Sequence, residues 1–129
     1  MIVVDSSVWI FALRGVLRPS TVRLRLETAR GRILLGDIIL LEIMRGARDE
    51  RHAARLEAKL RRLPLVTMMD VDLAIAAASN YRKLRSYGIT TRSFADTIIA
   101  TYCIEYGHEL LQDDRDFLPM AEYLGLRLA

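Results

Sequence analysis

The sequence contains little of what secreted, zinc-binding or membrane-spanning proteins require. Its single cysteine, Cys103, excludes an intramolecular disulfide and lies in an apolar helical pattern typical of a core. The two histidines, His52 and His108, are isolated, which excludes a Cys/His zinc motif. No uncharged apolar run is long enough to span a bilayer, and the amino terminus lacks the pattern of a signal peptide. We therefore expect a soluble cytoplasmic protein that does not bind membranes.

Internal repeats, linkers and low-complexity segments are also absent. The 129 residues are 52% hydrophobic and 27% charged, which is typical of a globular chain. A chain of this length is large enough for one core and small for two. The sequence therefore predicts a single domain over residues 1–129.

Positive charge is carried almost entirely by arginine and is unevenly distributed. Lys59 and Lys83 are the only lysines, and the net charge is +3. Six arginines and one acid, Glu27, lie between Arg14 and Arg32, and a second basic stretch runs from Arg45 to Arg62. Acids instead predominate between residues 105 and 116. Basic flanks around an acidic centre suit an enzyme that binds a polyanion, although a solvated arginine-rich surface would give the same pattern.

Short apolar runs alternate with helical patterns along the chain. The predicted strands begin at Ile2 and then cover Ile33–Leu35, Leu65–Thr67, Glu109–Gln112 and, as a fifth candidate, Leu126–Leu128. The predicted helices cover Val8–Leu13, Pro19–Gly31, Ile38–Ala47, Asp49–Pro64, Asp70–Gly88, a segment from Thr91 or Ser93 to Gly107, and Phe117–Tyr123. This alternation predicts an α/β fold, a three-layer α/β/α sandwich around a mainly parallel sheet of four to five strands.

Asp5 follows the first apolar strand and precedes an apolar helical pattern. Open α/β sheets bind their ligands at the carboxyl ends of strands, so a carboxylate here suits a site. Asp and Ser before a helix are equally ordinary N-cap residues. The distant acids favour the site, with Ser6 or Ser7 left to cap the helix.

Glu42 and Asp96 are acids within apolar helical patterns. Glu42 lies in Ile38–Met44, a helix apolar nearly all round that we expect to be buried, so its carboxylate needs a partner. That partner is either Arg45, one turn later, or a metal ion, and the apolar surroundings favour the metal. Asp96 either completes a capping box with Ser93 or points into the crevice, and both can hold.

Three aspartates, Asp113, Asp114 and Asp116, follow the fourth predicted strand. Capping a helix needs one acid, and like charges packed together cost stability unless a cation neutralises them. Several carboxylates without histidine or cysteine suit Mg²⁺ or Mn²⁺. The chemistry this implies is metal-assisted hydrolysis of a phosphodiester.

Four motifs together resemble the PIN-domain ribonucleases, and most closely the VapC-type toxins of toxin–antitoxin pairs. They are Val3-Val4-Asp5-Ser6-Ser7-Val8-Trp9-Ile10, Leu41-Glu42-Ile43-Met44-Arg45-Gly46, Phe94-Ala95-Asp96-Thr97-Ile98-Ile99-Ala100 and Asp114-Arg115-Asp116-Phe117. The resemblance covers essentially the whole chain, in order, as a single PIN domain. Gln112 departs from the threonine that the family often carries two residues before its fourth acid.

By position, the resemblance assigns the catalytic and metal-binding acids to Asp5, Glu42, Asp96 and Asp114, with Asp116 as the alternative to Asp114. Ser7 matches a polar residue that supports the first acid, and Arg45 a basic residue after the second. The implied activity is that of an Mg²⁺- or Mn²⁺-dependent endoribonuclease acting on structured RNAs, transfer RNA included. The implied partners are a second copy, as a homodimer, and a VapB-type antitoxin that covers the site.

Two other functions fit the same sequence. A PIN nuclease of RNA maturation or turnover would share every motif. A non-catalytic receiver-like interaction module also places acids at strand ends, but it would keep a lysine after a late strand, and both lysines here lie in helical patterns. Within the basic stretches, Arg48, Arg51 and Arg55 are the candidates for binding RNA, and neutralising Arg51 and Arg55 is predicted to weaken binding and its salt dependence.

Overall fold

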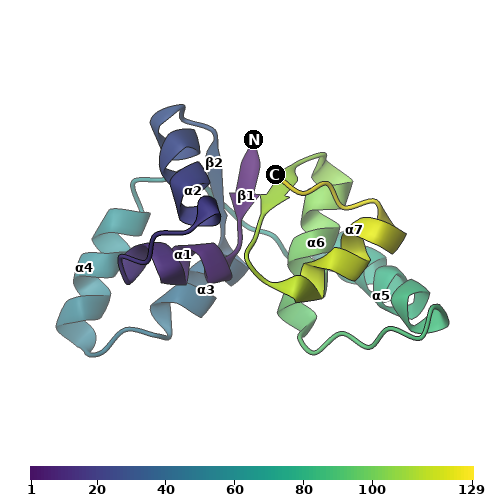
Figure 1. Ribbon diagram of the computed structural model, residues 1–129. Coiled ribbons are helices and arrows are strands. Elements are labelled where there is room, and N and C mark those ends of the chain that lie inside the picture. Colours follow the sequence, from purple (N-terminus) through teal and green to yellow (C-terminus); the bar gives the residue numbers. More distant parts are fainter.

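Short strands and helices alternate from Met1 to Ala129, all of which the computed structural model describes (Figure 1). The strands are β1 (Ile2–Val4), β2 (Ile33–Gly36), β3 (Leu65–Val66) and β4 (Glu109–Leu111). The helices are α1 (Ser6–Leu13), α2 (Pro19–Ala29), α3 (Asp37–Met44), α4 (Glu50–Leu60), α5 (Val71–Ser86), α6 (Phe94–Tyr106) and α7 (Leu118–Leu124), with a 3₁₀ turn η1 (Arg115–Phe117) before α7. None of the helices combines the length and apolar character needed to cross a membrane.

The four strands form one parallel sheet in the order β3-β2-β1-β4. Ile2 of β1 pairs with Ile33 of β2 on one side and Glu109 of β4 on the other. The predicted fifth strand is wrong as a strand, since only Leu128 bridges to Leu110. Two backbone hydrogen bonds flank this bridge, from Leu110 to Arg127 and from Ala129 to Leu110, and they do not extend into a ladder.

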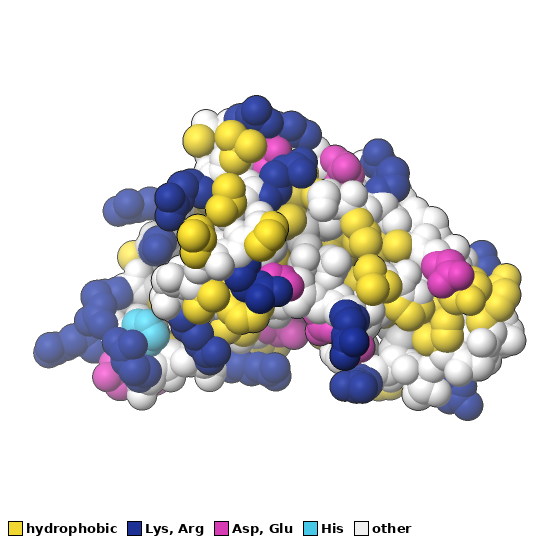
Figure 2. Space-filling view, viewed as in Figure 1, with side chains coloured by type: hydrophobic (Ala, Val, Ile, Leu, Met, Phe, Trp, Pro, Cys, Tyr) yellow, Lys and Arg dark blue, Asp and Glu magenta, His cyan; other side chains and the backbone are white.

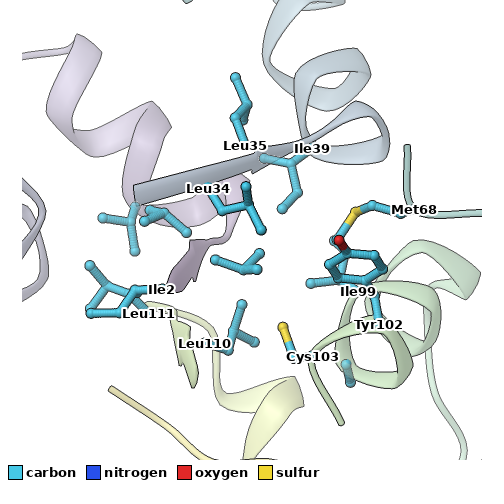
Figure 3. Packing of buried hydrophobic residues seen from close by; sticks show 14 of the residues in the cluster. Ile2, Leu34, Leu35, Ile39, Met68, Ile99, Tyr102, Cys103, Leu110 and Leu111 are labelled. Carbon is cyan, nitrogen blue, oxygen red and sulfur yellow. The ribbon is translucent and has the colours of Figure 1, made fainter. Parts of the chain in front are cut away.

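Helices cover both faces of the sheet, which confirms the predicted three-layer α/β/α architecture. In Figure 1, α1 to α4 lie on one side and α5 to α7 on the other. The central strand β1 is completely buried because its neighbours and both helical layers exclude water. Figure 3 shows Leu34 of β2 and Leu110 of β4 packing toward Ile99, Tyr102 and Cys103 of α6, whereas Ile2 lies beside Leu111 away from that helix. The cysteine is thus a core residue, as predicted.

Two local predictions about helices α1 and α3 were wrong. Helix α1 begins at Ser6 rather than Val8, because Asp5 is its N-cap and accepts the backbone N–H of Ser7 at 3.0 Å, so neither serine is the cap. Helix α3 is not buried all round, since Leu41 is 63% exposed. Helix α3 buries only the face that carries Ile39 and Ile43, which leaves Leu41 on the surface.

The strand order places a crevice at the carboxyl edge between β1 and β4. From β1 the chain runs to β2 on one side, and it later crosses over to β4 on the other. Such a reversal of direction separates the two flanking connections and opens the place where α/β sheets bind ligands. Asp5 follows β1 directly, and Asp113 to Asp116 follow β4.

A carboxylate cluster as the candidate metal centre

Asp5 is held by one of its carboxylate oxygens and leaves the other without a partner. Oδ2 accepts the hydroxyl of Ser7 at 2.6 Å and the backbone N–H of Ser7 at 3.0 Å. Oδ1 is buried and forms no hydrogen bond. Burial raises the pKa of Asp5, the hydrogen bonds from Ser7 and Ser6 oppose this, and the charge of Asp114 adds to it. The residue is therefore the cap of α1 and keeps one buried carboxylate oxygen without a hydrogen-bond partner.

Glu42 borders the same crevice from α3. Its Oε1 accepts the hydroxyl of Ser6 at 3.3 Å. Arg45, the alternative partner that the sequence offered, is exposed and forms no ion pair with Glu42. Burial raises the pKa of Glu42, and the charge of Asp5 raises it further. The carboxylate is thus left with a neutral hydroxyl as its hydrogen-bond partner.

Asp96 lies in the first turn of α6 and faces the other acids. Ser93 caps this helix by accepting the N–H of Ala95 at 3.1 Å, but no bond from Ser93 to the carboxylate completes a capping box. Burial raises the pKa of Asp96 to about 7, with added contributions from the charges of Asp5, Asp114, Glu42 and Asp116. The charge of every other acid of the site therefore acts on Asp96. Of the two roles that the sequence predicted, a carboxylate pointing into the crevice describes the structure better than a member of a capping box.

The turn after β4 brings two aspartates to this cluster. Oxygens of Asp96, Asp114 and Asp116 all lie within 4.8 Å of one another. Asp114 uses Oδ1 to accept the N–H of Asp116 at 2.9 Å, and Gln112 accepts the N–H of Asp114 at 2.6 Å. Gln112 thus shapes the turn through its side-chain amide. Both Asp114 and Asp116 stay candidates for the fourth ligand.

Asp113, the third acid of the turn, is not part of the cluster. Its carboxylate accepts two hydrogen bonds from the guanidinium of Arg18, at 2.5 and 2.7 Å, and one from the hydroxyl of Ser20 at 2.7 Å. These bonds hold the pKa of Asp113 below its usual value. Its backbone N–H donates to the Ser7 hydroxyl at 3.0 Å, which joins the β4 turn to the support of Asp5. Sequence reasoning missed this role, since Arg18 lies 95 positions away.

The three arginines predicted to bind RNA do not lie on one surface. Arg48 lines a groove with Glu42, whereas Arg51 and Arg55 lie on the exposed surface of α4 outside it. Figure 2 shows Lys and Arg side chains gathered over the half that carries α1 to α4, and acids in the hollow between the two halves. Sequence reasoning missed Arg14 and His52, which share the groove with Arg48. Only the fold brings residue 14 beside residues 48 and 52.

The donor set fits a hard divalent cation. Every side chain at the centre of the cluster offers carboxylate oxygen, and none offers nitrogen or sulfur. Oδ1 of Asp5 has no partner, and burial together with the charges of neighbouring acids raises the pKa of Asp5, Glu42 and Asp96. The fold and the cluster together define a class, a parallel α/β protein with an acidic site at the switch point of its sheet.

Comparison with known proteins specifies that class further. The PIN domain family matches residues 2–123. Ribonuclease VapC11 of Mycobacterium tuberculosis is 34% identical over 131 aligned residues, which cover 100% of this chain and 98% of that protein. The chain therefore belongs to the PIN-domain family and, within it, to the VapC ribonucleases.

Solved structures have the same fold. A DNA-bound VapBC structure from Salmonella typhimurium has a TM-score of 0.74 at 22% identity and covers 99% of this chain and 96% of its own. VapC20 of Mycobacterium tuberculosis, described as a sarcin-ricin loop cleaving toxin, has a TM-score of 0.68 at 19% identity, with 98% and 99% covered. The predicted PIN-like fold is thereby confirmed.

Proposed function

We propose that this protein is a metal-dependent endoribonuclease and the toxin of a type II toxin–antitoxin pair. The observation that carries the proposal is the convergence of Asp5, Glu42, Asp96 and Asp114 at one crevice, where burial and then the charges of the other acids raise the pKa of Asp96 to about 7. Membership of the VapC ribonucleases supports RNA as the substrate. VapC20, a structural neighbour, is described as a sarcin-ricin loop cleaving toxin.

In this proposal Asp5, Glu42, Asp96 and Asp114 hold Mg²⁺ or Mn²⁺, with Asp116 beside them. A divalent ion bound there supplies an activated water and stabilises negative charge on the departing oxygen. Ser7 fixes the Asp5 carboxylate through Oδ2, so that Oδ1 stays available. Gln112 and the Asp116 N–H together fix Asp114. Arg45, exposed and unpaired at the end of α3, offers a positive charge to the RNA.

The experiment compares the RNA of cells that express the wild-type chain or its Asp5→Asn variant, by sequencing the new RNA ends. Wild type should create discrete internal ends, with transfer RNA among the candidate targets, and arrest growth. Asp5→Asn should create none, because it removes one charged ligand while retaining a good N-cap residue. Identical ends from both proteins would overturn the assignment of the site.

A VapB-type antitoxin is the proposed protein partner. Several structural neighbours are VapBC complexes with antitoxin, some of them bound to DNA. Such a partner could inhibit the protein at the acidic crevice, because a segment lying across it would exclude both RNA and the ion. Loss of growth arrest on co-expression of the adjacent small reading frame would support the toxin role. Absence of such a frame would favour the alternative of a PIN nuclease in RNA maturation or turnover.

A homodimer is the proposed quaternary state. Large apolar side chains lie exposed on α3, α5 and α6, among them Leu41 at 63%, Val71 at 76% and Ile75 at 65%. Large exposed apolar side chains are enriched at contact surfaces between proteins. The receiver-like alternative is wrong, because the chain belongs to a nuclease family and its lysines lie in α4 and α5.

A further inference from the structure

A groove beside Glu42 carries basic side chains that the carboxylate cluster does not use. It lies between α1, α3 and α4 and has a volume of about 370 Å³. Ile10, Leu13, Ile43 and Leu56 form its apolar lining. Its polar lining consists of Glu42, Arg14, Arg48 and His52. Glu42 belongs to both the groove and the cluster, so the two are continuous.

The two arginines of the groove are available for an external anion. Neither Arg14 nor Arg48 forms an ion pair, and both side chains are exposed. Most other arginines of the first basic stretch are engaged within the chain by Asp113 or Glu27, namely Arg18, Arg23, Arg30 and Arg32. These four arginines share two carboxylates and are held within the chain, whereas Arg14 is unpaired and lines the groove.

His52 adds a hydrogen-bond donor of fixed orientation. Its Nδ1 accepts the backbone N–H of Arg48 at 3.0 Å, so the proton of the neutral ring lies on Nε2. Asp49 accepts the backbone N–H of His52 at 2.7 Å and so holds this first turn of α4 in place. Two arginines and a histidine with a free ring N–H thus line the groove, with Glu42 as its only acidic residue.

We infer that this groove binds the sugar–phosphate backbone of the RNA substrate, next to the phosphate that is cut. The inference rests on the proposed nuclease function. Donors at Arg14, Arg48 and His52 match phosphate and ribose oxygens, and apolar walls between them suit the face of a nucleotide. The volume is that of a small-ligand pocket, enough for one nucleotide. An acidic peptide lacks the ribose and base that these apolar walls between the donors suit.

Binding is measured in an Asp5→Asn background, which prevents cleavage, with a labelled mixed-sequence single-stranded RNA over a range of salt concentrations. Adding Arg14→Gln and Arg48→Gln should weaken binding about tenfold or more. The plot of log affinity against log salt has a negative slope, which should become shallower by about 1.4, because two phosphate contacts are lost at about 0.7 each. The matched control is Arg82→Gln with Arg85→Gln, an equal charge change on exposed positions of α5, which should leave the slope close to that of the parent.

The inference is overturned if the groove variant keeps the parent's affinity and slope, or changes no more than the control. It is equally overturned if the groove variant binds RNA normally and loses only the antitoxin, which would make the groove a protein-docking site. Cleavage by the wild-type chain separates the two proposals. If the wild type cuts RNA while the groove variant binds as its parent does, only the groove assignment fails. If the wild type neither binds nor cuts RNA, the proposed function fails first.

Discussion

Asp5 divides two tasks between its two carboxylate oxygens. Oδ2 caps α1 and accepts the Ser7 hydroxyl, whereas Oδ1 is buried without a partner. A carboxylate used only as a cap gains nothing from being 3% exposed, because burial without full pairing costs free energy. The sequence offered capping and metal binding as alternatives, and the geometry is compatible with both at once.

Ser7 offers a test of how far Asp5 depends on its support. Ser7→Ala removes the 2.6 Å bond to Oδ2 and the acceptor for the Asp113 N–H. We expect Mn²⁺ affinity, measured by calorimetry, to fall about 10- to 100-fold, as is usual when a ligand loses its supporting hydrogen bond. Ser7→Thr keeps the hydroxyl and should retain most of the affinity. Equal affinity in Ser7→Ala and wild type would mean that the ion does not use Asp5.

The pKa of Asp96 predicts an unusual pH dependence for the metal-free protein. Its pKa is raised from 3.8 to about 7, so between these values the folded state holds a proton that the unfolded state has released. The free energy of unfolding should therefore fall as pH rises from about 4 to about 7. In chelator, Asp96→Asn should lose this part of the dependence and melt above wild type at pH values beyond 7. Thermal melts across pH test this, and parallel curves for both proteins would contradict it.

At the scale of elements, helix α2 is tied to the start of β2 by one buried acid. Glu27 is fully buried and contacts Arg23 at 2.8 Å, Arg32 at 3.3 Å and Arg30 at 3.5 Å. The hydrogen bond from Arg23 lowers the pKa of Glu27 most, burial opposes it, and the charges of the arginines lower it further. The acid therefore holds three arginines of the first basic stretch within the chain, although one carboxylate balances only one of their charges.

Glu27→Gln should lower the melting temperature markedly at neutral pH, because three arginines lose their buried counter-charge. A lowered pKa stabilises the folded state above the ordinary value of 4.5, and this contribution disappears as pH falls through the lowered value. The variant and wild type should thus converge in acid. Glu57→Gln, which breaks an exposed pair with Arg61, should change little. A Glu27→Gln protein as stable as Glu57→Gln would contradict the role of this acid.

Elements with strong local signals could be predicted, and those set by tertiary contacts could not. The strands from Ile2, Ile33 and Glu109 were predicted from their apolar runs, and α6 from its serine cap and Gly107, which takes a positive φ. The candidate strand at Leu126–Leu128 failed, because a strand needs a partner over several residues and local sequence does not reveal one. The exposure of Leu41 was missed for a related reason, since apolar periodicity does not say which face finds a neighbour.

At the scale of the whole molecule, the exposed apolar side chains predict association of two copies. Leu41→Asp together with Ile75→Asp should convert a dimer to a monomer in light scattering, because a charge at the centre of an apolar interface is left unpaired. Leu17→Asp is the control, since Leu17 is 80% exposed in the loop between α1 and α2. If the protein with Leu41→Asp and Ile75→Asp stays a dimer while Leu17→Asp becomes a monomer, the interface lies elsewhere.

The site as a whole was only partly visible in the sequence. The acids could be predicted because each is surplus to local needs, whether as Glu42 in an apolar helix or as three aspartates in one turn. Asp113 was not separable from Asp114 and Asp116, because its partner Arg18 is brought to it only by the fold. The groove of Arg14, Arg48 and His52 was hidden for the same reason.

The central claim is that these acids hold a divalent ion with which the protein cuts RNA. Its most direct test is the initial rate of RNA cleavage by wild type and Asp96→Asn, measured with Mg²⁺ or Mn²⁺ and again in chelator. We predict cleavage only by wild type with added ion, and a rate at least about 100-fold lower for Asp96→Asn at every ion concentration. Full cleavage by metal-stripped Asp96→Asn protein would contradict it.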